Sequence, residues 1–513
     1  MDGTEREFEI KLTVDARGAA MLAARLSARG YAPRRQARVH QVSTYFDTDD
    51  GDLRARGLAL RIRTAGRRIE QTVKANPVTG PGITAGLSNP IEHTSVLNTD
   101  WPDAQRIDAD ILRHSVASAI ADKGLHPTVT TDVVRLIRPL WSANGSVEAA
   151  LDDGAIHAGD RSVAVLELEI EAKDCPPDPV FQWARTLAGD LPFALSTHNK
   201  AEQGFALFDG ALEPLDTPVR LERTAAKPDA SAATTGTKLL SALAPAIAQN
   251  HFALQTGTLP EGPHQFRVTL RRLRAVLKAL QPIMRKSVAR HLEDHARSLA
   301  RLAGPLRDAD VLIDEIVAPV YREHGHHSAI ADLLRRLEER RDRLRNHVRH
   351  ELCAARTGEL VVDLSELAAS QDWIRRSNRT DPPTIADIAP GVLDREWKRV
   401  NRRARGLADL DTEQRHALRR AVKRLRYVSE IMAAVADPGR TAVFIRQTRK
   451  LQNAFGTLND LALAETLRDD ASGLRIGAAV DHVIGWHATR ADAAWGKVEK
   501  RWTALDEAGP FWK

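Results

Sequence analysis

The chain has 513 residues, 28% of them charged, and a formal net charge of +6. This length suggests two to four domains, and the basic balance favours a polyanionic partner such as a nucleotide, a polyphosphate or a nucleic acid. Only two cysteines occur, which excludes a disulfide framework and a cysteine-rich zinc site.

A cytoplasmic protein is expected for three reasons. The two cysteines, Cys175 and Cys353, are far apart, as is usual in a reducing compartment. The N-terminal stretch is charged from Asp2 onward and has no apolar signal core. The sequence has no run of about 18 apolar residues, so no membrane span is predicted.

The first predicted element is a β-strand at residues 5–12, where charged and apolar side chains alternate. One face carries Glu5, Glu7, Glu9 and Lys11, and the other carries Phe8, Ile10 and Leu12. This period of two is typical of a half-buried strand. Neighbouring carboxylates repel each other, so a divalent cation or nearby Arg and Lys must offset them. The alternative is a solvated face with a chance run of charge.

The rest of residues 13–210 predicts an α+β domain. Strands at 58–64 and 68–75 form a predicted hairpin, and three further strands are predicted at 128–141, 146–159 and 162–173. Helices are predicted at about 15–29, 103–123 and 178–191.

Several of these strands carry charges at every second position. Arg61 and Arg63 share one face, and Glu167, Glu169 and Glu171 repeat the acidic pattern of the first strand. Acidic and basic rows would face one another across a closed sheet, where a buried charge costs several kcal/mol unless it is paired. The interior therefore either pairs its charges or holds metal and polyanion.

Residues 212–236 predict a linker, because they are poor in large apolar residues and rich in Pro, Ala, Ser and Thr. Beyond it, helical spacing predominates and the sequence repeats itself. Residues 264–274 match residues 416–426 at an offset of 152 that is maintained over some 45 positions. The predicted domains are thus 1–211 and 237–513, the latter with two helical copies at about 237–380 and 384–513.

Each copy places cationic side chains along one helical face. The first copy spaces them by three and four residues, and the second copy repeats this spacing until Glu430. A solvated face is the simpler interpretation, but it would have no reason to recur at a fixed offset. The predicted polyanion-binding residues are His264, Arg267, Arg271, Arg274, Lys278 and Arg297, with His416, Arg419, Lys423, Arg426 and Arg449 in the second copy.

The first domain resembles the CYTH superfamily, the triphosphate tunnel metalloenzymes. Residues 4–208 contain EFEIK, YFDT, LRIR, TVK, ALDDG, LELEIEAK and HNKAEQG in the family's order. The resemblance implies an eight-stranded antiparallel tunnel barrel that binds triphosphate with Mg²⁺ or Mn²⁺. One departure is SNPIEHTSVL, which keeps Glu92 but has no arginine beside it.

The same resemblance implies the site residues. The implied metal ligands are Glu7, Glu9, Asp152, Glu169 and Glu171; the implied catalytic residues are Glu7, Glu9 and Lys11; the implied phosphate-binding residues are Lys11, Arg61, Arg63, Lys74, Arg135 and Lys200.

The second domain resembles the CHAD domain, through the pattern HxxRVxxRRLR and the later LAGPLRDAD, over about residues 237–510. This resemblance implies two tandem four-helix bundles with a basic cavity for inorganic polyphosphate. The second copy has Asn459 where the first has Arg307, so the two halves are expected to bind polyphosphate with different strength.

We therefore expect a cytoplasmic, metal-dependent tripolyphosphatase joined to a polyphosphate-binding module, which could also place the protein on polyphosphate granules. Three alternatives are an adenylate cyclase, a nucleoside or thiamine triphosphatase, and a non-catalytic polyphosphate-binding protein. A nucleic-acid partner is not favoured, because no aromatic side chain is interleaved in the basic stripes to stack bases.

Overall fold

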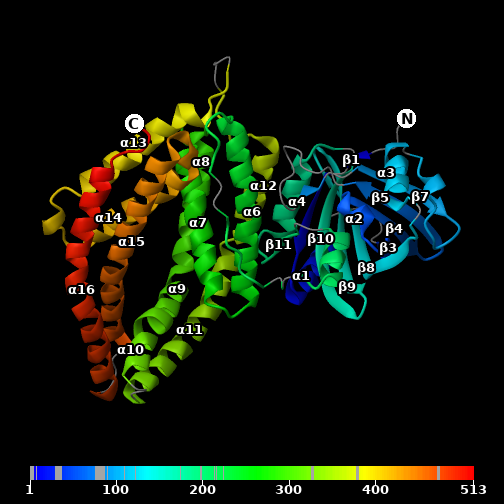
Figure 1. Ribbon diagram of the computed structural model, residues 1–513. Helices are drawn as coiled ribbons and strands as arrows, with labels where there is room; N and C mark the ends of the chain where they lie inside the picture. The colour runs from blue at the N-terminus through cyan, green and yellow to red at the C-terminus, as the bar shows by residue number, and fades with distance from the viewer. Residues whose placement is uncertain are drawn as a thin grey trace. The chain divides into compact units, whose positions relative to one another are not determined.

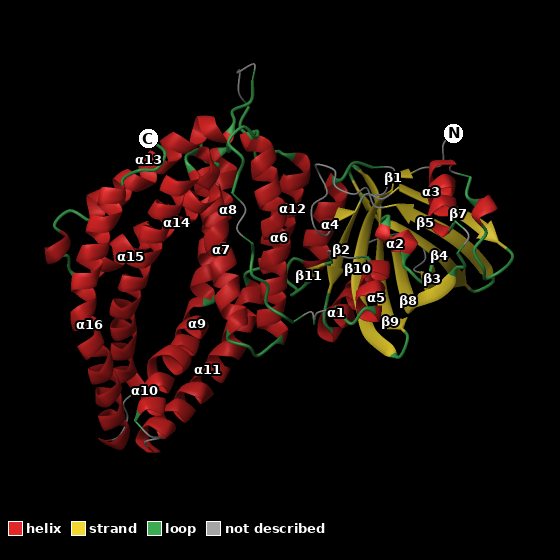
Figure 2. Ribbon diagram, viewed as in Figure 1, coloured by secondary structure: helices red, strands yellow, loops and turns green. Residues whose placement is uncertain are grey.

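The computed structural model describes residues 5–6, 8–28, 37–75, 87–88, 91–108, 110–121, 123–173, 175–196, 199–212, 214, 216–222, 225–324, 328–376, 381–470 and 474–513. The chain divides into two compact units. The first consists of residues 1–219, 241–258 and 356–370, and the second of residues 220–240, 259–355 and 371–513. Figure 2 shows strands in the first unit and helices throughout the second, so the prediction of an α+β region followed by a helical region is confirmed.

The described part of the first unit contains one antiparallel sheet of eleven strands. They are β1 (Glu5–Arg6), β2 (Glu9–Thr13), β3 (Ala37–Asp47), β4 (Leu58–Ala65), β5 (Arg68–Ala75), β6 (Leu87–Ser88), β7 (Ile91–Leu97), β8 (His126–Ser142), β9 (Gly145–Ala158), β10 (Arg161–Lys173) and β11 (Ala194–Leu195). Their order is β1-β7-β5-β4-β3-β8-β9-β10-β2-β11, with β6 also paired to β2.

The expected closed barrel of eight strands is therefore corrected on two counts. Three of the eleven strands, β1, β6 and β11, have only two residues: β6 and β11 were not predicted, and the strand predicted at 5–12 contains both β1 and the start of β2. The hydrogen-bonded pairs also form an open path rather than a ring. β1 pairs with β7 at one end of this path, and β2 pairs with β10 near the other end. Because β1 ends at Arg6 and β2 begins at Glu9, the chain nevertheless keeps the two ends close together.

The alternation predicted for the first strand and for β10 holds in the structure. Ile10, Leu12, Leu168 and Ile170 are fully buried on one face of the sheet. Helices α1 (Ala16–Ser27) and α4 (Asp178–Ala188) pack against β2, β9 and β10. The charged side chains of the same strands are thereby left to the opposite, inner face.

Helix α5 (Lys200–Phe208) packs against β8, β9 and β10 and brings Lys200 to the charged side chains. Asn199 caps this helix in a capping box with Glu202, which defines where it begins. Tyr45 and Val129 form an apolar cluster with α5 residues, next to the charges. The predicted helix at 103–123 is shorter, comprising η1 (Ala104–Arg106) and α3 (Asp110–Ile120); a short α2 (Asp52–Ala55) was not predicted.

Two segments from later in the chain complete the first unit, namely the second part of α6 (Ala232–Thr256) and α12 (Thr357–Ser370). Helix α12 packs on α4, where Arg185 pairs with Glu366 and lies 2.8 Å from Asp363. The Cα of Gly358 approaches so closely that a Cβ there would lie 2.7 Å from the ring of Phe193. Residues outside the predicted 1–211 domain therefore pack on it.

The stretch predicted as a linker is held by backbone hydrogen bonds where it is described. Ala226 N–H donates to the carbonyl of Ile431 and Ala232 N–H to that of Pro383, each at 2.9 Å, and α6 already begins at Ala232.

The described part of the second unit is helical (Figure 1). After the first part of α6 come α7 (Glu261–Ala279), α8 (Lys286–Leu302), α9 (Gly304–Val311), the π-helix η2 (Leu312–Val317), α10 (Ala318–Glu323) and α11 (Ser328–Ala354). The second copy has α13 (Ile385–Arg403), α14 (Thr412–Ile431), α15 (Pro438–Glu465) and α16 (Leu474–Ala508). None of the described helices has the length and apolar composition needed to cross a membrane.

Candidate active site and anion groove

Strand register places the charged side chains of four strands side by side on the inner face of the sheet. Lys11 on β2 lies opposite Glu169 on β10. On β9, Asp152 lies opposite Glu167 of β10 on one side and opposite Arg135 of β8 on the other. Residues from distant parts of the chain thus meet in one row because the pairing is antiparallel and in register.

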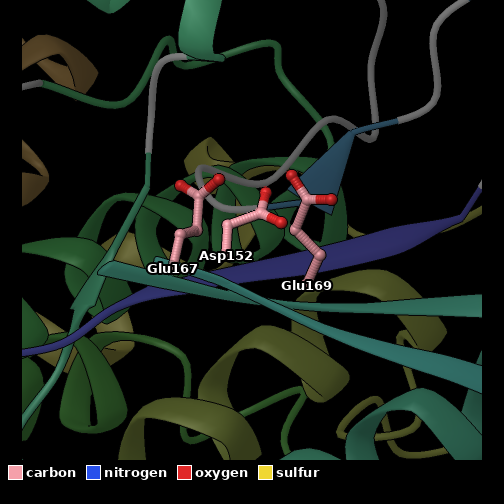
Figure 3. A group of neighbouring side chains, drawn as sticks. All are labelled: Asp152, Glu167 and Glu169. Carbon is pink, nitrogen blue, oxygen red and sulfur yellow. The ribbon is translucent and has the colours of Figure 1, made fainter. Parts of the chain in front are cut away.

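Three carboxylates form the centre of this row. Asp152, Glu167 and Glu169 are all buried or nearly so, and one oxygen from each lies within 4.8 Å of the others. Figure 3 shows the three side chains projecting to the same side of the sheet. Among the described residues they form the one group of carboxylate, His or Cys side chains with this spacing.

Two cations neutralise the three carboxylates. The Arg135 guanidinium donates to both oxygens of Asp152, at 2.7 and 2.6 Å, and to Glu169 at 2.6 Å. The ammonium of Lys200 lies 2.6 Å from Glu167, 2.7 Å from Glu169 and 2.8 Å from Asp152. Lys200 therefore sits where a cation shared by three carboxylates is most favoured.

The pKa values of the carboxylates differ because burial and charge compete differently at each. Burial alone would raise the pKa of Glu169, but Arg135 and Lys200 outweigh it and hold that pKa well below its usual range. The balance is the same at Asp152, whose pKa is lowered. At Glu167 burial prevails over Lys200, and the pKa is raised. The cluster thus holds carboxylates of unequal basicity.

The first-strand residues join this cluster at its edge. Lys11 lies 2.9 Å from Glu9 and 3.5 Å from Glu169. Burial opposes the charge of Lys11, but Glu169 and Glu9 together raise its pKa. Glu171 lies 2.5 Å from Lys173 and is not part of the three-carboxylate group. Glu7, the remaining predicted ligand, lies outside the described residues.

Two arginines of β4, Arg61 and Arg63, lie on the same face of the sheet as this row and have few carboxylates around them. Among the described residues, Arg63 has no carboxylate within 4 Å, and its Nε donates to Ser43 at 3.3 Å. The charge of Arg61, together with burial, lowers the pKa of Arg63 to about 10. Burial would raise the pKa of Tyr45, but Arg61 and Arg63 lower it. Arg63 therefore lies beside a second guanidinium group without a carboxylate partner of its own, an arrangement that favours a bound anion.

Glu92 has a partner that the sequence did not suggest. It pairs with Lys74, which lies opposite it on β5, and it is 3.8 Å from Arg61. Burial would raise the pKa of Glu92, but Lys74 and Arg61 lower it. Lys74 is thus paired with the carboxylate of Glu92, the residue that has no arginine beside it in the sequence.

The carboxylate cluster fits a hard divalent cation. Three oxygen donors within 4.8 Å of one another match the ligands that Mg²⁺ and Mn²⁺ prefer, and the ammonium of Lys200 already lies among them. An ion would share these carboxylates with Lys200 and Arg135 or displace one of them.

Replacing Lys200 by methionine tests this fit. The variant leaves buried carboxylates short of one countercharge, so we expect it to be less stable than the parent by about 3–5 kcal/mol in EDTA. Added Mg²⁺ or Mn²⁺ should raise the melting temperature of the variant by more than it raises that of the parent. Equal metal-induced shifts in both proteins would show that no ion enters among these carboxylates.

The two predicted stripes of the second unit meet in the structure. Helices α7 and α14 pack together. Among the charges that act on Lys423 of α14 are those of Arg271 and Arg267 of α7, and Arg271 also acts on Arg419. The cations of the two stripes therefore lie close enough to repel one another, and we refer to Arg267, Arg271, Arg274, Lys278, Arg419, Lys423 and Arg426 together as the anion groove.

The C-terminal part of each stripe meets one carboxylate. Glu293 of α8 lies 2.5 Å from Lys278, 3.6 Å from Arg274 and 3.1 Å from Arg297. A cavity of about 320 Å³ there is lined by Lys278, Glu293 and Arg297, among other residues. On α14, Glu430, where the stripe breaks, lies 3.0 Å from Arg449 and 3.8 Å from Arg426.

The two predicted histidines lie at the start of the stripes. Burial and the charge of Arg307 lower the pKa of His264. Burial and the charge of Arg419 lower the pKa of His416. Both rings are therefore neutral near pH 7 in the free protein.

Comparison with known proteins gives matches over both regions. A CYTH domain model matches residues 5–205, and a CHAD domain model matches residues 210–469. A curated relative, the inorganic triphosphatase of Haemophilus influenzae, is 25% identical over 165 residues, which cover 32% of this chain and 45% of that protein. The chain thus spans about half the length of this relative.

Solved structures with similar folds also cover one region each. The CHAD domain of Ricinus communis is 22% identical, covers 56% of this chain and 96% of its own, and has a TM-score of 0.47. A protein described as a putative adenylyl cyclase from Hippeastrum with a dominant triphosphatase activity is 20% identical. It covers 40% of this chain and 98% of its own, with a TM-score of 0.30.

Proposed function

The chain belongs to the CHAD domain family and carries a CYTH domain at residues 5–205, and from this premise we propose that it hydrolyses inorganic triphosphate with Mg²⁺ or Mn²⁺ and binds inorganic polyphosphate in its anion groove. Hydrolysis belongs to the first unit and polyphosphate binding to the second. The curated inorganic triphosphatase supports the hydrolytic part through a partial match only.

The observation that carries the proposal is the juxtaposition of two unlike charge clusters on one face of one sheet. Asp152, Glu167 and Glu169 supply oxygen donors for a cation, while Arg61 and Arg63 supply two positive charges, of which Arg63 has no carboxylate within 4 Å among the described residues. A metal–triphosphate complex has the complementary distribution of charge, because its cation is held by the anionic chain. A site for a neutral ligand would need neither cluster.

The reaction adds water to one phosphorus and breaks a bridging P–O bond, giving pyrophosphate and orthophosphate. Arg61 and Arg63 would hold oxygens of the chain and stabilise the charge that develops on the transferred phosphoryl group. Lys11 and Arg135 contact Glu169 and would hold this carboxylate beside the bound triphosphate.

Asp152, Glu167 and Glu169 would hold the metal ion, with Glu9 beside them. A bound divalent ion neutralises phosphate oxygens and lowers the pKa of water, which makes hydroxide available near neutral pH.

The anion groove supports polyphosphate because its central cations are not paired with carboxylates. Among the described residues, neither Arg271 nor Lys423 has a carboxylate within ion-pair distance, whereas Lys278 is paired with Glu293 and Arg449 with Glu430. A flexible polyanion without bases satisfies such a groove, since no aromatic side chain lies in the stripes to stack a base.

A substrate panel tests the proposal. Phosphate release by the full chain is measured with tripolyphosphate, ATP, thiamine triphosphate and long-chain polyphosphate, each with Mg²⁺ or Mn²⁺. We expect tripolyphosphate to give the highest kcat/KM. A higher value for ATP or thiamine triphosphate, or cyclic AMP as the product from ATP, would replace the proposed substrate.

A further inference from the structure

The centre of the anion groove contains cations of two kinds. Arg267 donates to the carbonyl of Ala300 at 2.7 Å, and Arg419 donates to the side chain of Asn459. Arg271 and Lys423 lie between them. In the part of the chain that the structure describes, neither Arg271 nor Lys423 makes a side-chain hydrogen bond or an ion pair, and Lys423 is half-buried.

The two central cations are equivalent in the internal repeat, because Arg271 and Lys423 are 152 residues apart, which is the repeat offset. The side chains are not equivalent chemically. An arginine stays charged at any pH that a protein meets, while a buried lysine next to other cations gives up its proton readily. The second copy therefore places the one amine among guanidinium groups at the centre of the groove.

The groups around Lys423 make its charge unfavourable in the free protein. On its own helix these are Arg419 and Arg426, and on α7 they are Arg271 and Arg267. The carboxylates nearby are engaged elsewhere or protonate more easily. Burial raises the pKa of Asp308 on α9 and of Asp460 on α15. Glu430 on α14 pairs with Arg449 of α15. Glu396 on α13 pairs with Arg399 and Arg424.

Deepening the polyphosphate proposal for this groove, on which it rests, we infer that a polyanion enters the anion groove together with one proton, which Lys423 takes up. The amine is neutral when only arginines surround it and becomes an ammonium when phosphate oxygens approach. Burial and the four arginines lower the pKa of Lys423 to about 7, which agrees with this exchange. Binding in the groove is thereby coupled to pH.

The coupling has a definite sign. Below pH 7 Lys423 is already charged in the free protein, so binding of the polyanion takes up few protons. Above pH 7 each bound chain must bring a proton, and the affinity falls by up to about tenfold per pH unit until the pH approaches the ordinary lysine pKa. A Lys423→Arg variant keeps the charge at all these pH values and should show no such fall.

The test measures proton uptake directly. Medium-chain inorganic polyphosphate is titrated calorimetrically into full chain carrying Arg61→Met and Arg63→Met, with EDTA, so that the first unit contributes little. Titrations at pH 8 in two buffers of different ionisation enthalpy give the number of protons taken up. We expect about one proton, and close to none when Lys423→Arg is added.

Two controls separate the possible failures. His264→Gln with His416→Gln removes the other groups in the groove that could take up protons, and the uptake at pH 8 should persist. Uptake that is unchanged by Lys423→Arg, or that vanishes with the histidines, overturns the inference. Absence of polyphosphate binding between pH 6 and 9 overturns the proposed function of the groove instead. If Lys423→Arg does not fold by circular dichroism, Lys423→Met serves: its proton uptake at pH 8 should be close to none, and its affinity should not fall between pH 7 and pH 9 as that of the parent does.

Discussion

Asp152→Asn should lower metal-dependent phosphate release from tripolyphosphate by at least about 100-fold. Asp152 is completely buried, accepts two hydrogen bonds from Arg135 and lies 2.8 Å from the Lys200 ammonium. The amide keeps the shape of the side chain but removes a negative charge from the proposed metal site. Arg135 and Lys200 would then lack a countercharge, and the remaining carboxylates would bind a divalent ion weakly.

A matched control stands beside it in the sequence. Asp153 is on the same strand but points to the opposite face and is exposed, so Asp153→Asn changes the same net charge outside the site. It should retain the parental rate. Because removing one partner of a buried ion pair can destabilise by about 3–5 kcal/mol, circular dichroism must show that Asp152→Asn is folded. Glu169→Gln is the second variant, and parental activity in a folded form of either would contradict the site.

Arg271→Leu combined with Arg419→Leu should weaken long-chain polyphosphate binding by about two to four decades. Each charge-assisted contact to an anion is worth about 1.5–3 kcal/mol, and the two side chains come from facing helices of the two repeats. The loss should also reduce the dependence of affinity on salt, since fewer cations are neutralised on binding. The measurement is the dissociation constant at two salt concentrations.

The comparison for this pair is Arg335→Leu with Arg343→Leu. Both arginines are exposed on α11 and outside the anion groove, and their removal changes the net charge equally. Their loss should weaken binding only slightly. If both pairs weaken binding by the same amount, the protein binds polyphosphate through net charge, and the two stripes are solvated faces.

Local patterns in the sequence predicted the parts of the fold that rest on alternation or repetition. The period of two placed Glu9 and Lys11 on one face of β2 with Ile10 and Leu12 on the other, as the structure has them. The constant offset of 152 residues predicted that the helices carrying Arg271 and Arg419 are related, and the structure packs these two helices together.

Features that depend on pairing between distant strands could not be read in this way. The two-residue strands β1, β6 and β11 exist only through their partners, so the strand number was wrong. Glu167 lay in a noticed acidic row but was not selected, because its grouping with Asp152 follows from the β9–β10 register. Its spacing of two from Glu169 was the available signal.

The counter-ions of the groove were missed for a similar reason. Glu293 lies on α8 and meets Lys278 of α7 only through helix packing. Glu430 was read as a break in the stripe, although its distance of 3.8 Å from Arg426, four residues earlier, is the usual one for a helical ion pair. Charge patterns along one helix do not reveal which neighbour neutralises them.

The central claim is that the first unit is a metal-dependent triphosphatase, and one measurement tests it most directly. The full chain, freed of metal with EDTA, is mixed with tripolyphosphate, and orthophosphate is followed before and after an excess of Mg²⁺ or Mn²⁺ is added. No release is expected before the addition, and equal amounts of orthophosphate and pyrophosphate are expected after it. Release that continues in excess EDTA, or none with either metal, would contradict it.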